Sequence, residues 1–153
     1  MDSPRTEGLH LEQSDTASGL TFAIARHARD GATAGQIADA VVAMWQQIDA
    51  ALSPVIGGGG MAALYARSLD RVESVYPWLH VAVEGDRQTM ELAPLRAAIA
   101  AQSRRSAAAA GCSTLQTFNA LLESMIGPSL CESFLSPLWA RPSPDAPKQG
   151  SPP

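Results

Sequence analysis

Residues 48–69 read IDAALSPVIGGGGMAALYARSL, and residues 118–139 read FNALLESMIGPSLCESFLSPLW. A constant offset of seventy positions aligns the two stretches and pairs their Ile-Gly dipeptides, which begin at Ile56 and Ile126. Each stretch contains an apolar segment, the Ile-Gly break and a second apolar segment. Helices separated by so short a break usually fold as a pair or a sharp corner. We therefore expect two helix–Ile-Gly–helix units that pack against each other.

Apolar residues upstream of the first break recur every three or four positions, as on one face of a helix. Thr33 is a suitable N-cap, and Gln36 completes the spacing of a capping box. We expect Pro54 to kink or end this helix, and the next helix to end before Pro77. The two predicted stripes are Ile37, Val41, Met44, Trp45, Ile48, Leu52 and Val55, followed by Met61, Leu64, Tyr65, Ser68, Val72, Val75 and Tyr76.

The second half of the chain shows the same spacing. A helix is expected over 91–102, with Pro94 in its first turn, and two more follow the alanine-rich residues 106–111. Residues 79–90 are predicted to be irregular, although Val81 and Val83 alternate as in a short strand. The predicted stripes are Leu92, Leu95 and Ile99; Leu115, Phe118, Leu122, Met125 and Ile126; and Leu130, Phe134, Leu135, Leu138 and Trp139.

These patterns predict an all-α protein, a compact bundle of four to five helices built from the two helix–Ile-Gly–helix units. Residues 33–140 form the predicted bundle, and residues 19–32 are a short helix or linker that ends at Gly31. Residues 1–18 are polar and charged, and residues 141–153 are rich in proline, so both are expected to be disordered tails.

Composition and charge disfavour several classes of function. The net charge is −4, and the longest basic run is the pair Arg104-Arg105, which disfavours binding to nucleic acid or to anionic membranes. No apolar run reaches the length that spans a bilayer, and the first residues do not resemble a signal peptide. We expect a soluble cytoplasmic protein.

Neither a metal site nor a cofactor can be derived from the cysteines and histidines. Cys112 and Cys131 do not form a C-x-x-C pair, and His10, His27 and His80 are scattered. Neither cysteine has a neighbouring histidine or basic cluster that would make it a nucleophile. We expect both to be small buried hydrophobic residues.

Four glycines, Gly57, Gly58, Gly59 and Gly60, could form either a hinge or an anion-binding loop. Met61-Ala62-Ala63 follows, so the lysine and hydroxyl of a phosphate-binding Walker loop are missing. A helix rather than a strand precedes them, which disfavours a dinucleotide loop. A hinge is the favoured interpretation, although free N–H groups at a helix start can hold an anion.

Three side chains near these glycines are further candidates for binding a ligand or partner. Arg67 could hold a carboxylate or phosphate beside the loop, or pair with Asp70 on the surface. Tyr65 would face the core in the second case. Trp78 could line a pocket or an interface, or close one end of the bundle.

His27 invites comparison with histidine phosphotransfer domains, which are also small helical bundles. Those domains carry lysine and glycine at the third and fourth positions after the histidine. Here Gly31 fits, but Asp30 replaces the lysine and would repel a phosphoryl group. A solvated histidine near a helix end is the favoured interpretation.

The chain resembles small helical proteins inferred from bacterial genomes that have no assigned activity. The strings SPVIGGGGMAALYARSL, YPWL and LLESMIGPSLCESFLSPLW, within residues 36–140, carry the resemblance. It implies an all-helical fold and transfers no catalytic residue. Signalling is implied by association alone.

The leading hypothesis is a non-enzymatic helical module that binds another protein or itself, with a regulatory or adaptor role in bacterial signalling. Two alternatives remain open. One is a sensor of a small anion or nucleotide with a pocket near Gly57–Gly60, and the other is phosphotransfer through His27.

Overall fold

Both Ile-Gly dipeptides lie at a bend between two helices. A computed structural model describes residues 19–84 and 90–139. Helix α2 (Ala34–Glu73) is interrupted at Gly57, and Gly127 separates α5 (Arg104–Ile126) from α6 (Pro128–Trp139). The two glycines share one conformation, with φ 85° and ψ 155° at Gly57 and φ 89° and ψ 155° at Gly127. Glycine adopts this positive φ without the steric cost that a Cβ brings.

The correspondence between the two halves extends beyond the bends. Thr33 caps α2 and Ser103 caps α5, each with extended backbone and a side chain that accepts a hydrogen bond from the N–H three residues later. A short helix precedes each cap: residues 19–29 before α2, and α4 (Ala93–Ala100) before α5. Each half is thus a short helix, a long helix, a bend and a second helix.

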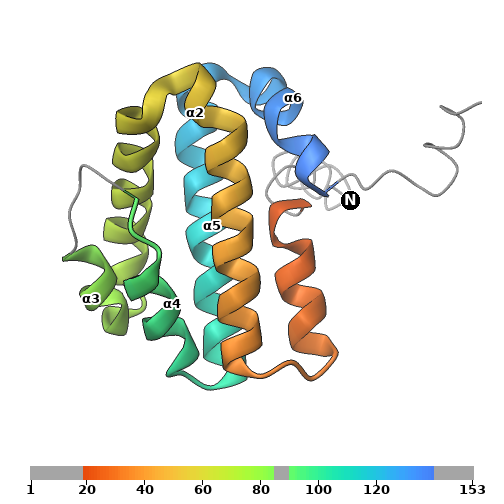
Figure 1. The fold of residues 1–153 in the computed structure, drawn as a ribbon, viewed down its shortest axis with the longest axis vertical. Helices are drawn as coiled ribbons and strands as arrows, with labels where there is room; N and C mark the ends of the chain where they lie inside the picture. The colour runs from red at the N-terminus through yellow and green to blue at the C-terminus, as the bar shows by residue number, and fades with distance from the viewer. Residues whose placement is uncertain (1–18, 85–89, 140–153) are drawn as a thin grey trace, which may run out of the picture.

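Each half runs across the molecule from one side to the other, and the two halves run in opposite senses (Figure 1). The first part of α2 and α5 run side by side in the same direction. The 19–29 helix lies on one side of this pair, near α6, and α4 lies on the other side, near the second part of α2. Both bends lie at the same end, at the top of Figure 1. The halves are therefore arranged about an approximate twofold axis that runs along the two long helices. The predicted all-α bundle is confirmed.

The two long helices cross where Val41 meets Gly111. A Cβ built on Gly111 would lie 2.5 Å from Cγ2 of Val41, so any larger residue would collide there. Trp45, fully buried, packs edge-on against Phe118 and Tyr65, with ring centroids 5.1 and 4.9 Å apart. These contacts form the centre of the core.

The 19–29 helix packs on the bundle and is not a linker. Leu20 and Ile24 are fully buried and belong to the same hydrophobic core as α2 and α5. The Cys112 thiol of α5 lies 4.0 Å from the carbonyl oxygen of Thr21. Gly31, with φ 86°, ends this segment as predicted.

Two predictions about backbone structure were wrong. The segment with Val81 and Val83 is helical, as η1 (Pro77–Leu79) followed by α3 (His80–Val83), because its N–H groups bond locally, such as Glu84 N–H to His80 O. Pro54 lies inside α2, and the break comes at Gly57, since only glycine can adopt that bend cheaply.

Several residues of the predicted stripes are exposed. The exposed fractions are 51% for Val55, 67% for Val75, 59% for Met125 and 50% for Leu130. Val75 follows α2, which ends at Glu73, before the predicted end at Tyr76. The other three flank the bends, where the chain turns away and leaves one side of each helix without a neighbour.

In the described residues, no helix is both long and apolar enough to cross a membrane. The predictions for residues 1–18 and 141–153 lie outside the described residues.

We predict that Gly111→Ala destabilises the protein by about 1–3 kcal/mol, because the new methyl group collides with the stiff Val41 side chain. Gly58→Ala is the matched control: Gly58 has helical backbone, and no atom lies within 4 Å of its Cβ position. That change should stabilise by up to about 1 kcal/mol. Urea denaturation measures both, and equal effects at the two sites would contradict the proposed helix crossing.

Candidate binding groove

A groove of about 930 Å³ runs between the 19–29 helix and the first part of α2. Each helix lines it with one face, since the lining residues recur every three or four positions. Leu138 of α6 also lines it. The helical residues that form the two walls are Gly19, Phe22, Ala23, Arg26 and His27 on one side, and Gln36, Asp39, Ala40, Ala43, Met44 and Gln47 on the other.

One part of the groove is apolar and lined largely by small residues. Phe22 is 54% exposed there, although neighbouring Leu20 and Ile24 are fully buried. Ala23 and Ala43 leave room beside it, because their side chains end at a methyl group. The exposed ring of Phe22 in a concave surface makes this part of the groove a candidate for binding an apolar group.

The part near the turn between the helices is charged. Arg26 and Asp30 lie 3.9 Å apart, and both side chains are largely exposed. Such exposed pairs contribute little to stability, so either side chain can pair with a bound molecule at little cost.

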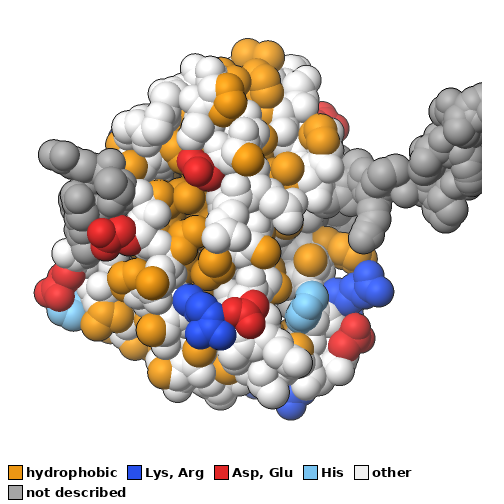
Figure 2. Space-filling view, viewed as in Figure 1, with side chains coloured by type: hydrophobic (Ala, Val, Ile, Leu, Met, Phe, Trp, Pro, Cys, Tyr) orange, Lys and Arg blue, Asp and Glu red, His pale blue; other side chains and the backbone are white. Residues whose placement is uncertain are grey.

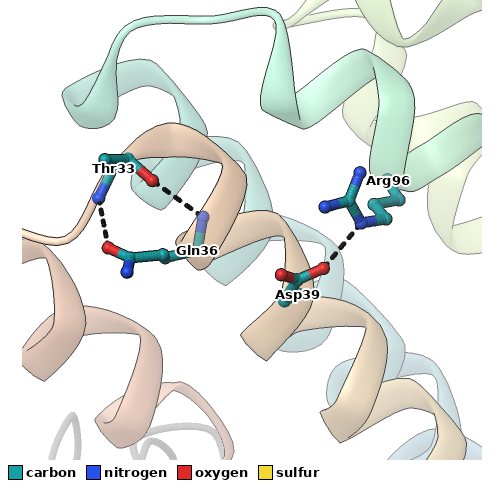
Figure 3. A network of polar contacts seen from close by, with 4 residues as sticks. All are labelled: Thr33, Gln36, Asp39 and Arg96. Atoms are coloured by element: carbon teal, nitrogen blue, oxygen red, sulfur yellow. Dashed lines mark hydrogen bonds and ion pairs between the residues drawn. The ribbon is translucent and has the colours of Figure 1, made fainter.

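Asp39 on the opposite wall is held by α4 (Figure 3). Its carboxylate accepts a hydrogen bond of 2.6 Å from Arg96 Nε. This hydrogen bond, together with the positive charge of Arg96, lowers the pKa of Asp39. The carboxylate is therefore ionised at neutral pH and points towards α4.

The turn that joins the two walls is fixed by a capping box, also visible in Figure 3. The Thr33 side chain accepts from Gln36 N–H at 3.1 Å, and the Gln36 side chain accepts from Thr33 N–H at 2.9 Å. Together they satisfy two helix-end donors, as the sequence predicted.

His27 lines the groove on an exposed helix face. Its Nδ1 lies 2.8 Å from the carbonyl oxygen of Ala23. A carbonyl only accepts, so Nδ1 carries a proton, and in the neutral imidazole Nε2 then keeps its lone pair. Asp30 lies three residues further on, in the turn that follows this helix.

The structure does not bring the glycine candidates together with the groove. Gly57, Gly58 and Gly59 are exposed at the bend, and open space surrounds the position of a Cβ on each. A Cβ built on Gly60 would lie 3.5 Å from Cβ of Ile56, an ordinary contact distance. None of them lines the groove. Their role in anion binding stays a prediction.

Tyr65, Arg67 and Trp78, the other predicted binding residues, differ in how deeply they are buried. Tyr65 is buried, its hydroxyl donates to the carbonyl oxygen of Glu91 at 3.0 Å, and burial raises its pKa. Arg67 is exposed. Trp78 is half-buried against Tyr76, with ring centroids 6.0 Å apart.

Both cysteines are free thiols; Cys131 is buried as predicted, whereas Cys112 is only half-buried. Burial raises the pKa of Cys112 to about 11 and, together with the charge of Glu123, that of Cys131 to about 12. Cys131 lies 3.1 Å from Oδ1 of Asn119, which accepts its hydrogen bond. Within the described residues, no three His, Cys, Asp or Glu side chains gather in a way that could hold a metal.

The sequence analysis missed the groove apart from His27. Phe22 could have indicated the groove from the sequence. It lies between Leu20 and Ile24 along the helix, so its side chain points away from the face that those two residues bury. The opposite wall could not be found from the sequence, since alanines at positions 40 and 43 suit core and surface alike.

Comparison with protein-family models, with curated proteins and with solved structures gives no match to this chain. The resemblance to helical bacterial proteins stays a prediction.

We predict that thiol reagents modify Cys112 before Cys131 in the folded protein. Relative to an ordinary thiol with a pKa near 9, a pKa of about 12 lowers the thiolate fraction of Cys131 at pH 8 by about a thousandfold. Mass spectrometry after timed alkylation measures both rates, with urea-unfolded protein as the reference. Equal rates for Cys131 in folded and unfolded protein would contradict its burial.

Proposed function

We propose that the chain is a helical interaction module that binds an amphipathic helix of a partner protein in the groove. The exposed Phe22 beside Ala23 and Ala43, in a groove walled by two helices, is the observation that carries the proposal. A regulatory or adaptor role fits binding without chemistry, and a role in bacterial signalling rests on the resemblance alone.

A helix fits the shape of this groove better than an extended strand does. Both walls are helix faces whose backbone N–H and C=O groups are already bonded, so no edge offers hydrogen bonds to a strand. The face between Gly19 and Asp30 is about 16 Å long at 1.5 Å per residue, which matches about three helical turns.

The groove also specifies the polarity of the partner. Phe22 and Ala43 favour apolar side chains in one part of the bound helix, where burial provides most of the affinity. Arg26 favours an acidic group, and Asp30 a basic one, in the other part. The partner helix should therefore be apolar along one face and charged towards one end.

We predict that a photo-crosslinking residue at position 43 captures a partner reproducibly, whereas the same residue at position 63 does not. Ala43 and Ala63 are both exposed alanines of α2, but only Ala43 lines the groove. Mass spectrometry should locate the crosslink in an amphipathic helical segment. A peptide of that segment should bind the full chain in a titration.

Variants then test whether the groove is the binding surface. Phe22→Asp and Ala43→Arg should each raise the dissociation constant of the titrated peptide by about tenfold or more, because each places a charge in the apolar part of the groove. Ala63→Arg should leave binding unchanged. Capture at both positions alike, or binding that survives Phe22→Asp, would refute the proposal.

Phosphotransfer through His27 is the second candidate. What favours it is the position of His27 on an exposed helix face, with Nε2 available to accept a phosphoryl group. Asp30, one turn away, opposes the approach of that anionic group.

We predict that, if His27 serves this role, a donor histidine kinase produces acid-labile phosphate on the wild type and none on His27→Gln. His80→Gln is the control, since His80 is also exposed. A label that persists in His27→Gln, or no label from a panel of donor kinases, would eliminate this candidate.

A further inference from the structure

The chain leaves α6 at the groove. Leu138 lines the groove, and residues 140–153 follow directly after Trp139. In Figure 1, α6 ends beside the upper end of the 19–29 helix. Figure 2 shows hydrophobic side chains over the upper part of this helix and charged and histidine side chains over its lower part. Residues 140–153 therefore begin at the apolar end of the groove.

The internal repeat indicates which segment belongs at this place. In the first half, the chain leaves the second part of α2 and turns back as η1 and α3, and both pack against α4. The second part of α2 corresponds to α6, and α4 corresponds to the 19–29 helix. At the offset of seventy, η1 and α3 correspond to residues 147–153. By this correspondence, the segment that follows α6 belongs against the 19–29 helix.

The charges of residues 140–153 are opposite to those of the groove. One basic and two acidic side chains line the groove, and the segment carries two basic residues and one acidic residue. They are Arg26, Asp30 and Asp39 in the groove, and Arg141, Asp145 and Lys148 in the segment. Asp39 is already paired with Arg96. Arg26 and Asp30 are thus the side chains that the segment would meet.

A proline-rich segment suits a groove whose walls are helices. Pro142, Pro144 and Pro147 favour the polyproline II conformation, which needs no backbone hydrogen bonds from a neighbour. This conformation has three residues per turn and rises about 3.1 Å per residue. Pro142, Asp145 and Lys148 would therefore share one face, at intervals of about 9 Å.

The groove presents the matching side chains in the same order. Phe22, Arg26 and Asp30 follow each other at intervals of four residues, which is about 6 Å in a helix. A proline would pack on the Phe22 ring, Asp145 would pair with Arg26, and Lys148 with Asp30. The long Arg and Lys side chains can take up the difference in spacing.

Residues 1–18 also adjoin the groove, at Gly19. Four of their five charged residues are acidic, so this segment would meet Asp30 and Asp39 with like charge. Charge therefore favours the segment after α6.

We propose that residues 140–148 bind in the groove of their own chain and compete there with the partner helix. The inference rests on the proposed function, because it concerns the regulation of the same groove. Attachment at Trp139 makes this binding intramolecular, so weak contacts are favoured by a high effective concentration. A partner helix must displace the segment, which lowers the apparent affinity of the groove.

We predict that a photo-crosslinking residue at position 43, in the purified full chain without a partner, joins to residues 140–148. Mass spectrometry locates the crosslink, and a mixture of isotope-labelled and unlabelled chains shows whether it forms within one molecule. The same residue at position 63 is the control, because Ala63 is exposed and does not line the groove. Asp145→Arg should lower the yield at position 43 by about threefold or more, because it places like charge against Arg26.

Exchange of the charges tests the contact itself. Arg26→Asp should restore the crosslink yield of Asp145→Arg, because the two charges are then opposite again. Arg29→Asp should not restore it, since Arg29 is exposed on the same helix and does not line the groove. Both arginines are exposed, so these variants should keep the helical circular dichroism of the wild type.

Binding of the partner peptide separates this inference from the proposed function. Asp145→Arg should lower the dissociation constant of the peptide by about threefold or more, because the segment competes less. A crosslink to residues 140–148 without capture of any partner would support the contact and refute the proposed function. Partner capture without that crosslink, a crosslink to residues 1–18, or a yield that Asp145→Arg leaves unchanged would overturn the inference.

Discussion

The contact between Val41 and Gly111 is the constraint on which the arrangement depends. The two positions are equivalent in the two halves, and they meet near the axis that relates them. A side chain on the axis faces its own counterpart, and two valines would need more space than this crossing provides. A valine on one helix and no side chain on the other resolves the conflict and lets the helices approach closely.

The same asymmetry continues one turn along the core. Trp45 of α2 donates its indole N–H to the Thr114 hydroxyl at 3.3 Å, and Thr114 donates to the carbonyl oxygen of Gly111 at 2.8 Å. At the offset of seventy, Thr114 corresponds to Met44, and Trp45 to Leu115. One half thus supplies a large ring with a polar edge, and the other supplies the hydroxyl that satisfies it. The halves share a backbone plan, but their side chains are complementary and not interchangeable.

The backbone plan was predictable from the sequence because it depends on local patterns. Apolar spacing fixes which face of a helix is buried, and an Ile-Gly break marks where the helix bends. Residues 79–84 were predicted to be irregular because α3, with four residues, is too short to show the apolar spacing of a helix. Exposure at Val55 and Met125 could not be predicted, because spacing gives the direction of a side chain and not whether another element lies there.

The groove was harder to predict because it depends on which helices lie side by side, and the spacing of apolar residues within one helix does not give this.

One wall of the groove is held by fewer buried side chains than the other. The 19–29 helix buries two large apolar side chains, Leu20 and Ile24, and each contributes about 1.5–3 kcal/mol. The α2 wall is held by the whole core, including the crossing at Gly111. The 19–29 wall therefore belongs to the less stable part of the fold, and we expect it to shift more readily than α2 if the proposed partner helix binds.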